Sequence, residues 1–285
     1  MESFDIAIIG CGPAGLSAAI NAKIRGKKVQ VFGAEVCSPK LESAPWVENY
    51  LGLPLSGSEL GQRYLKHFTD MGLTIHRHRV DTIVSTGTGF MLAAKGEIYE
   101  ARSLILATGI SQTSYLPGER DFVGLGVSYC GTCDGPLYKG KVVAVVGYTS
   151  EAVEEANFLA TIAAKVYFIP QNIPFADIHD DIEVVPGKPI GILGEDHLTK
   201  LALRDRELQV DGVFIFREVT PVEQLLTDLA LSQGAIDVDR QMATNIPGVF
   251  AAGDCTGRPF QLAKAVGEGA VAGLSAASFL DRKPR

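Results

Sequence analysis

A glycine-rich turn between an apolar strand and a helix constrains the fold of this chain most strongly. Residues 4–9 (FDIAII) form an apolar run of buried-strand length, and Pro13 suits the first turn of a helix with apolar residues at helical spacing. Gly10, Gly12 and Gly15 lie between them and permit a tight turn, close approach to a pyrophosphate and close helix–strand packing. The pattern predicts an α/β fold with a dinucleotide at the helix N-terminus, where unpaired N–H groups favour an anion. The alternative is an ordinary glycine-rich crossover.

The next strand, ending in VFGAE (residues 31–35), departs from the usual nucleotide-binding pattern. An acidic residue normally contacts the ribose at this strand end. Gly33 occupies that place and Glu35 lies two residues further on, so the ribose contact stays open. Cys11, between two glycines of the turn, is expected to act as a small packed residue, since nothing nearby in the sequence would activate it.

Residues 244–280 match the second half of a flavin site. A short apolar strand ends in Gly253-Asp254, and a helix rich in small residues follows from about Gln261. The aspartate can bond a ribityl hydroxyl, and the helix N-terminus can face the pyrimidine edge of the flavin. Upstream, LILATG (104–109) is typical of the strand at which a chain leaves a flavin domain. Two distant segments that complete one site predict a domain interrupted by an insertion.

The insertion carries Cys130 and Cys133, two of five cysteines. An odd cysteine count in a chain of 285 residues argues against a secreted disulfide framework. No second cysteine pair or histidine pair completes a four-ligand zinc site, so no metal is expected. His76 and His78, on an alternating strand, are interpreted as surface residues. A redox disulfide and two structural thiols remain as the alternatives.

Charge and hydropathy exclude several function classes. The net charge of −7 argues against nucleic acid or an acidic membrane as the main partner. No apolar run approaches the roughly 18 residues of a membrane span, and the N-terminus lacks the features of a signal peptide. The sequence therefore predicts a cytoplasmic protein without a membrane segment.

The motifs GCGPAG, VENYLGLP, ATG, CGTCDG and IPGVFAAGD, in this order, resemble the low-molecular-weight thioredoxin reductases along essentially the whole chain. The resemblance implies an α/β protein of two Rossmann-like three-layer domains, the second inserted in the first. An FAD-binding domain would comprise residues 1–112 and 244–285, and an inserted disulfide domain residues 113–243. It further implies a homodimer that reduces thioredoxin.

The same resemblance implies individual roles. Cys133 would lie against the flavin, Cys130 would attack the thioredoxin disulfide, and Asp134 would transfer a proton, with helix capping as its alternative role. The family more often has Gln at the place of Lys40. The cofactor contacts implied by motif and position are Gly10, Gly12, Pro13, Ala14, Gly15, Gly33, Glu35, Lys40, Leu41, Asn49, Val80, Ala107, Thr108, Gly109, Gly253, Asp254, Gln261 and Leu262.

The inserted domain departs from NADPH-using members. Its own turn has Thr149 in place of the second glycine, and the acidic residues Glu151, Glu154 and Glu155 follow where a pyrophosphate would rest. The second strand ends at 169–172 (IPQN) without an arginine for a 2′-phosphate. We interpret this domain as a scaffold for the disulfide with a degenerate NAD(P)H site.

Together with VVGYTSEA, YFIPQ, GVFIFRE and GDCTGRPFQLAKAVGEG, these departures resemble the ferredoxin-dependent flavin thioredoxin reductases. That resemblance implies reduced ferredoxin as the electron donor. Three alternatives stay open: an NAD(P)H-dependent reductase, a diflavin disulfide oxidoreductase with a second FAD, and a flavin-binding redox sensor without turnover. Hinges are expected near 110–118 and 240–246. Arg217, Arg258 and Lys264 are candidates for a ferredoxin surface or plain surface charges.

Overall fold

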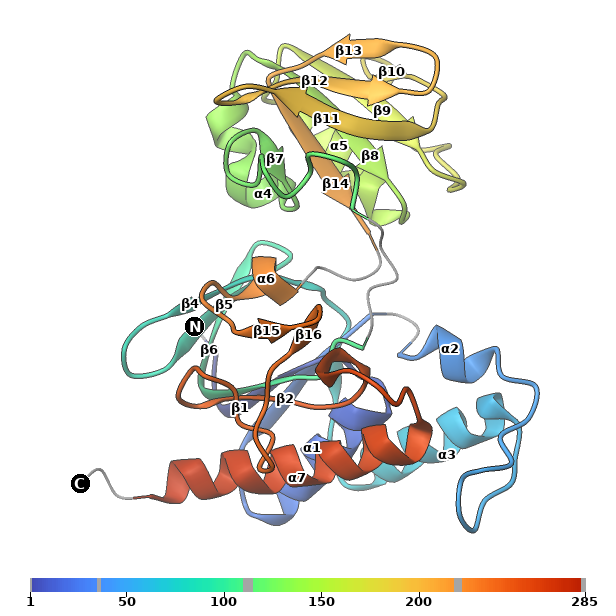
Figure 1. Ribbon diagram of the computed structural model, residues 1–285, viewed down its shortest axis with the longest axis vertical. Coiled ribbons are helices and arrows are strands. Elements are labelled where there is room, and N and C mark those ends of the chain that lie inside the picture. Colours follow the sequence, from blue (N-terminus) through green and yellow to red (C-terminus); the bar gives the residue numbers. More distant parts are fainter. Residues whose placement is uncertain (1, 35–36, 110–114, 218–221, 283–285) are drawn as a thin grey trace. The chain divides into compact units, whose positions relative to one another are not determined.

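The chain forms two compact units in the computed structural model, which describes residues 2–34, 37–109, 115–217 and 222–282 (Figure 1). The first unit comprises Met1–Ser111 and Pro221–Arg285, and the second Gln112–Thr220. The chain thus returns to the first unit near residue 220. The return was expected later, near residue 243. The reason is packing, because Leu225, Leu229 and Ile236 are buried in the core of the first unit.

The first unit is built on a seven-stranded sheet with the order β3-β2-β1-β6-β5-β4, and β17 pairs with β6. Its strands β1, β2, β3, β17 and β6 run parallel, and the first half of β6 also pairs with β5, which with β4 forms an antiparallel meander. The elements are β1 (Glu2–Ile9), α1 (Pro13–Ile24), β2 (Val29–Phe32), α2 (Pro39–Glu42), α3 (Gly57–Asp70), β3 (Ile75–His76), β4 (Val80–Ser85), β5 (Phe90–Ala94), β6 (Glu97–Leu106), α6 (Val222–Leu225), β15 (Leu231–Ser232), β16 (Ala235–Ile236), β17 (Val249–Ala251), η2 (Asp254–Thr256) and α7 (Leu262–Asp281).

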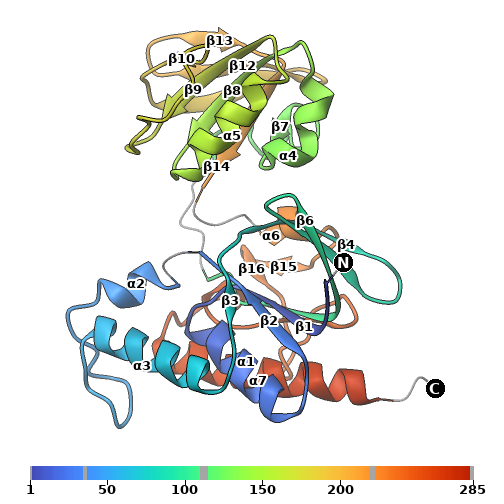
Figure 2. The ribbon, with the colours of Figure 1, turned by 180° about the vertical axis from the view of Figure 1, so that it is seen from behind.

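Helices α1 and α7 cover one face of this sheet side by side (Figure 2). Small residues allow their backbones to approach closely: a Cβ atom on Gly269 would lie 2.2 Å from the carbonyl oxygen of Ala14, and one on Gly273 2.4 Å from that of Ala18. The other face packs against side chains from β4, β5, α6 and β16. Helix α7 therefore joins the C-terminal part of the chain to the N-terminal glycine turn.

The second unit has a parallel five-stranded sheet with the order β10-β9-β8-β14-β7. Helices α4 and α5 lie on one face, and the antiparallel strands β11, β12 and β13 cover the other. Because both faces are covered, Val143 to Val146 of β8 are fully buried. The elements are β7 (Val127–Ser128), α4 (Gly131–Asp134), η1 (Gly135–Tyr138), β8 (Val142–Gly147), α5 (Glu151–Ala160), β9 (Lys165–Pro170), β10 (Glu183–Val184), β11 (Pro189–Gly194), β12 (Leu198–Leu203), β13 (Glu207–Gln209) and β14 (Gly212–Phe216).

The first unit thus combines helices with a mixed sheet that continues into an antiparallel meander, and the second combines helices, a parallel sheet and an antiparallel β layer. This confirms the predicted α/β fold of two Rossmann-like domains. None of the helices in the described ranges is both long and apolar enough to cross a lipid bilayer.

Candidate active site

The glycine turn of the first unit provides a cradle for a pyrophosphate. Gly10 has φ +114°, and a Cβ atom there would lie 2.1 Å from the carbonyl oxygen of Ala107. A Cβ atom on Gly15 would lie 1.9 Å from the carbonyl oxygen of Gly10. Gly12 is the N-cap of α1 and makes no side-chain cap bond, so the start of the helix is left open to an anion. A side chain at Gly12 would enter this open space.

The C-terminal motif lies at the same edge of the sheet. Ala252 donates its N–H to the carbonyl oxygen of Leu106 (2.9 Å), which places Gly253 beyond the carboxyl ends of β6 and β17. Gly253 has φ +90°, and a Cβ atom on it would lie 2.9 Å from that of Ala14. The two sequence motifs, far apart along the chain, thus meet at one edge of the sheet, and a dinucleotide at such an edge would bind in the crevice between them.

Two side-chain contacts join the segment around α2 to the C-terminal motif. Lys40 Nζ lies 3.2 Å from Asp254 Oδ2, and Asn49 Nδ2 donates to Gln261 Oε1 (2.8 Å). All four are predicted cofactor contacts, and the structure brings them together. The Lys40 side chain remains 68% exposed, so it borders the crevice. Leu41 is buried next to it, and Leu262 begins α7.

The remaining predicted contacts lie at the rim or base of the crevice. Thr108 and Gly109 directly follow β6, and Pro13 and Ala14 begin α1. Val80 is buried at the start of β4. Glu35 lies outside the described residues. The contact of each of these residues with a flavin stays a prediction.

Lys264 is not the plain surface charge that was expected, because it bonds to groups of the C-terminal motif. Its Nζ donates to the carbonyl oxygen of Gly253 (2.8 Å) and to Thr256 Oγ1 (2.9 Å), and lies 3.0 Å from Glu268 Oε2. Glu268 also accepts the N–H of Gly253 (2.9 Å). These bonds hold the Gly253 turn against side chains of α7. The i, i+4 spacing of Lys264 and Glu268 is the sequence signal that could have indicated the pair.

Cys11 is not a lone packed residue as predicted, because it forms a disulfide with Cys37. Cys37 follows β2 and precedes α2, so the bond connects the glycine turn to the end of the neighbouring strand. Sequence reasoning missed this pair because 26 residues separate its members and no motif links them.

The second unit carries the Cys130–Cys133 disulfide at the start of α4. Cys130 is the N-cap, and its Sγ accepts the N–H of Cys133 (3.1 Å). Cys133 is exposed and Cys130 half-buried. This contact gives the Cys130 sulfur a backbone donor that would stabilise a thiolate.

Asp134 ends α4 and does not cap its start, so the alternative role considered for it is wrong. Its Oδ2 accepts a hydrogen bond from Ser128 Oγ (2.6 Å), which in turn accepts the N–H of Cys130 (3.2 Å). Ser128 is buried and orients the carboxylate beside the disulfide. Sequence reasoning missed Ser128, since it precedes the cysteine motif without belonging to it.

A buried polar cluster fills the carboxyl edge of the parallel sheet in the second unit, where a dinucleotide would bind. Arg217, directly after β14, pairs with Glu119 (Nη2–Oε2 2.7 Å), and the two side chains are 3% and 0% exposed. Tyr129 donates its hydroxyl to Glu119 (2.9 Å), and the ring of Tyr148 lies 5.2 Å from the Arg217 guanidinium. Burial and the charge of Glu119 raise the pKa of Tyr129, which keeps its hydroxyl a proton donor.

Two further expectations are wrong. Arg217 is buried and cannot contribute to a ferredoxin surface, whereas Arg258 is exposed and lies over the ring of Phe260 (4.9 Å). The expected hinge at 240–246 lies inside the first unit, where Ala243 pairs with Phe250. Part of the other expected hinge, 110–114, lies outside the described residues. Thr149 Oγ1 is buried at the degenerate turn and finds no hydrogen-bond partner among the described residues.

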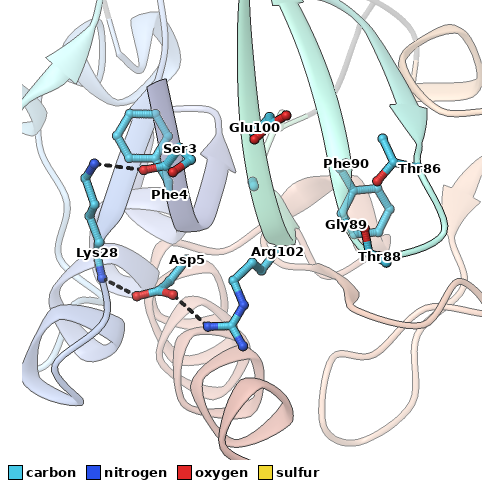
Figure 3. A pocket seen from close by; sticks show the side chains of 11 residues that line it. Ser3, Phe4, Asp5, Lys28, Thr86, Thr88, Gly89, Phe90, Glu100 and Arg102 are labelled. Atoms are coloured by element: carbon cyan, nitrogen blue, oxygen red, sulfur yellow. Dashed lines mark hydrogen bonds and ion pairs between the residues drawn. The ribbon is translucent and has the colours of Figure 1, made fainter. Parts of the chain in front are cut away.

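A separate cavity of about 410 Å³ lies at the amino end of β1, opposite the glycine turn (Figure 3). Asp5 there accepts from Arg102 Nη1 (2.9 Å) and from the backbone N–H of Lys28 (3.0 Å), and Lys28 Nζ donates to the carbonyl oxygen of Ser3 (2.8 Å). The cavity therefore belongs to neither the glycine turn nor the cysteine pair.

Comparisons with known proteins agree with this geometry. A family model described as pyridine nucleotide-disulphide oxidoreductase matches residues 4–269. A thioredoxin reductase of Aquifex aeolicus is 33% identical over 306 residues, which cover 99% of this chain and 95% of that protein. Among solved structures, a ferredoxin-flavin thioredoxin reductase from Clostridium acetobutylicum shares 48% identity, with a TM-score of 0.93 and 98% of each chain covered. An atypical thioredoxin reductase from Desulfovibrio vulgaris Hildenborough shares 32% identity, with a TM-score of 0.74 and 96% and 97% covered.

Proposed function

The chain belongs to the pyridine nucleotide-disulphide oxidoreductase family, as a thioredoxin reductase, and on this premise we propose that it carries electrons from reduced ferredoxin through FAD to thioredoxin. The proposal requires a flavin crevice, a reactive disulfide and a donor other than a pyridine nucleotide.

The crevice of the first unit fits FAD. The open N-terminus of α1 at Gly12 suits the pyrophosphate, and Asp254 suits a ribityl hydroxyl. Lys40, Asn49 and Gln261 would border the flavin. Bound there, FAD would supply a carrier that accepts electrons singly and delivers them in pairs.

The buried cluster of the second unit is the observation that carries the choice of donor. Glu119, Arg217 and Tyr148 lie at the sheet edge where NADPH would bind, and Thr149 puts a side chain where the second glycine of the turn would let the backbone approach a pyrophosphate. A nucleotide at this edge would compete for space with a buried ion pair, and leaving one partner of such a pair uncompensated costs about 3–5 kcal/mol. This supports ferredoxin over NAD(P)H, and it disfavours a second FAD at the same edge.

The cysteine pair performs thiol–disulfide exchange. In the reduced pair, the Cys130 thiolate attacks the thioredoxin disulfide and forms a mixed disulfide. Cys133 then gives its thiol proton to the Asp134 carboxylate, attacks the Cys130 sulfur and releases thioredoxin, and Asp134 passes that proton to the departing thioredoxin thiolate. Ser128 keeps the Asp134 carboxylate beside the pair.

Reduction potentials make this direction favourable. Plant-type ferredoxins lie near about −400 mV and thioredoxin near about −270 mV. Two electrons that fall through about 130 mV release roughly 6 kcal/mol, which drives thioredoxin reduction nearly to completion.

An anaerobic thioredoxin-reduction assay tests the proposal. Photoreduced ferredoxin should support turnover, and NADPH and NADH should neither support it nor bleach the flavin. Cys130→Ser should abolish turnover and retain the FAD. Bleaching by a pyridine nucleotide would support the NAD(P)H-dependent alternative. Two flavins per chain would support the diflavin alternative. A lack of turnover with every donor would support the redox sensor.

The proposal extends to a homodimer that works in the cytoplasm, as in the family that the sequence resembles. Light scattering should then give twice the chain mass of 30.4 kDa. A mass of one chain at micromolar concentration would contradict the dimer.

A further inference from the structure

We infer that Cys11 and Cys37 form a second redox site, whose disulfide controls how firmly the crevice retains its cofactor. The inference rests on the proposed function for the identity of that cofactor as FAD. The pair lies in the first unit and is chemically separate from Cys130–Cys133 in the second.

The disulfide spans the two loops that would enclose the adenosine half of FAD. Cys11 lies in the turn after β1, and Cys37 follows the neighbouring parallel strand β2. The carbonyl oxygen of Cys37 lies 3.5 Å from the position of a Cβ atom on Gly12, where the backbone approaches a pyrophosphate. Gly33, at the predicted ribose position, packs so closely on Cys11 that a Cβ atom would lie 2.4 Å from the Cys11 sulfur. The bond thus connects the pyrophosphate side of the crevice to the ribose side.

The two sulfurs differ in access, which sets the order of bond breaking. Cys11 is 2% exposed, whereas Cys37 is partly exposed. A thiolate of an attacking dithiol therefore forms a bond to Cys37 Sγ and breaks the Cys11–Cys37 bond. Cys11 leaves as a thiolate directly before α1, where the helix dipole favours negative charge, and then takes a proton. The second thiol of the dithiol attacks its own mixed disulfide and releases the Cys37 thiol.

This exchange reduces the protein disulfide by two electrons and two protons and converts the dithiol into a disulfide. A thioredoxin-type dithiol, the product of the proposed reaction, belongs to the class of reductant required. Accumulation of the reduced dithiol would thus open the Cys11–Cys37 disulfide and weaken the binding of FAD.

Cofactor binding and disulfide formation should favour each other. The closed bond holds Cys37 next to Gly12, and opening it removes the covalent link between Cys37 and the glycine turn. Because coupling between two sites is reciprocal, the factor by which the disulfide tightens FAD equals the factor by which FAD resists reduction of the disulfide. We expect a factor of about ten, within the usual range of such couplings.

Full-length protein with Cys130→Ser and Cys133→Ser isolates the site, since only Cys11, Cys37 and Cys255 remain. After alkylation of the denatured, oxidised protein, mass spectrometry should find a linked Cys11–Cys37 peptide and Cys255 as the free thiol. The FAD-loaded protein is then divided, and one part is reduced anaerobically with dithiothreitol, which is removed. On dilution, flavin fluorescence should show FAD release about tenfold faster from the reduced part, because affinity differences at one site lie mostly in the dissociation rate.

Cys37→Ser in the same background is the matched control. It cannot form the bond, so it should release FAD at the fast rate with and without prior reduction. The redox comparison on the protein with both cysteines needs no folding of this variant. Three free thiols in the oxidised protein, or equal release rates in both parts, would overturn the inference. If the enzyme still reduces thioredoxin with ferredoxin, such a result leaves the proposed function intact, whereas protein that cannot bind FAD refutes the proposed function itself.

Discussion

Breaking the buried ion pair of Glu119 and Arg217 should destabilise the second unit, and the loss should depend on which of the two residues is replaced. Removal of one partner from a buried ion pair costs about 3–5 kcal/mol, because the other charge stays buried. With Arg217→Met, the Glu119 carboxylate still accepts the N–H of Leu116 (2.8 Å) and the hydroxyl of Tyr129. We therefore expect a loss near 3 kcal/mol for this variant, the lower end of that range.

Glu119→Gln should cost more, about 5 kcal/mol, because the guanidinium keeps its full charge at 3% exposure. The double variant, Glu119→Gln with Arg217→Met, should be more stable than Glu119→Gln alone, since it contains no buried charge at this place. The control is Lys200→Ala, which removes an ion pair with Glu207 (2.9 Å) on the exposed surface of the same unit. Its loss should stay below about 1 kcal/mol.

Hydrogen exchange measured by mass spectrometry suits this test, because two units need not unfold in one transition. Peptides from β8 and β14 report on the second unit. Since about 1.4 kcal/mol corresponds to a factor of ten, exchange should accelerate about 100-fold in Arg217→Met and by more than 1,000-fold in Glu119→Gln. Exchange no faster than in Lys200→Ala, or a double variant whose loss equals the sum of the single losses, would refute the reasoning.

Three further outcomes test the site. Gly12→Val should yield folded but colourless protein, because its Cβ has room in the fold (3.5 Å) but enters the pyrophosphate space, whereas Gly267→Ala, with no atom within 4 Å, should keep the 450-nm absorbance; yellow Gly12→Val protein would contradict the cradle. Asp134→Asn should slow thioredoxin reduction about 100-fold and leave FAD binding unchanged, and an undiminished rate would exclude proton transfer by this residue. Burial raises the pKa of the Cys255 thiol to about 11, so iodoacetamide at pH 8 should leave it unmodified in the native protein and label it after denaturation; rapid native labelling would contradict its burial.

Local chemistry made the glycine turn and the strand ends predictable. Gly10 and Gly15 serve contacts a few residues away or on the adjacent strand, and such requirements appear directly in a motif. The meeting of Lys40 with Asp254, 214 residues apart, followed from the family resemblance and not from any periodicity. The fold of both units could be predicted from the local motifs together with the family resemblance.

Pairs without a motif could not be predicted. Glu119 and Arg217 are 98 residues apart and no motif links them, so Arg217 was interpreted as a surface charge although it directly follows the apolar strand β14. Cys11 and Cys37 were obscured by the stronger signal of the CxxC spacing. The return boundary near residue 220 was missed because α6, β15 and β16 are short and carry no nucleotide motif.

The nesting of one unit within the other has a consequence for biosynthesis. Proteins emerge from the ribosome N-terminus first, and domains generally fold as units. The second unit is continuous in sequence, and its sheet is complete once β14 has been made. The first unit must wait for β17 and α7, whose glycines pack on α1. A nascent chain halted before residue 249 should therefore already contain a folded second unit with Cys130 and Cys133. Its first unit would still lack β17 and α7 and would remain incomplete.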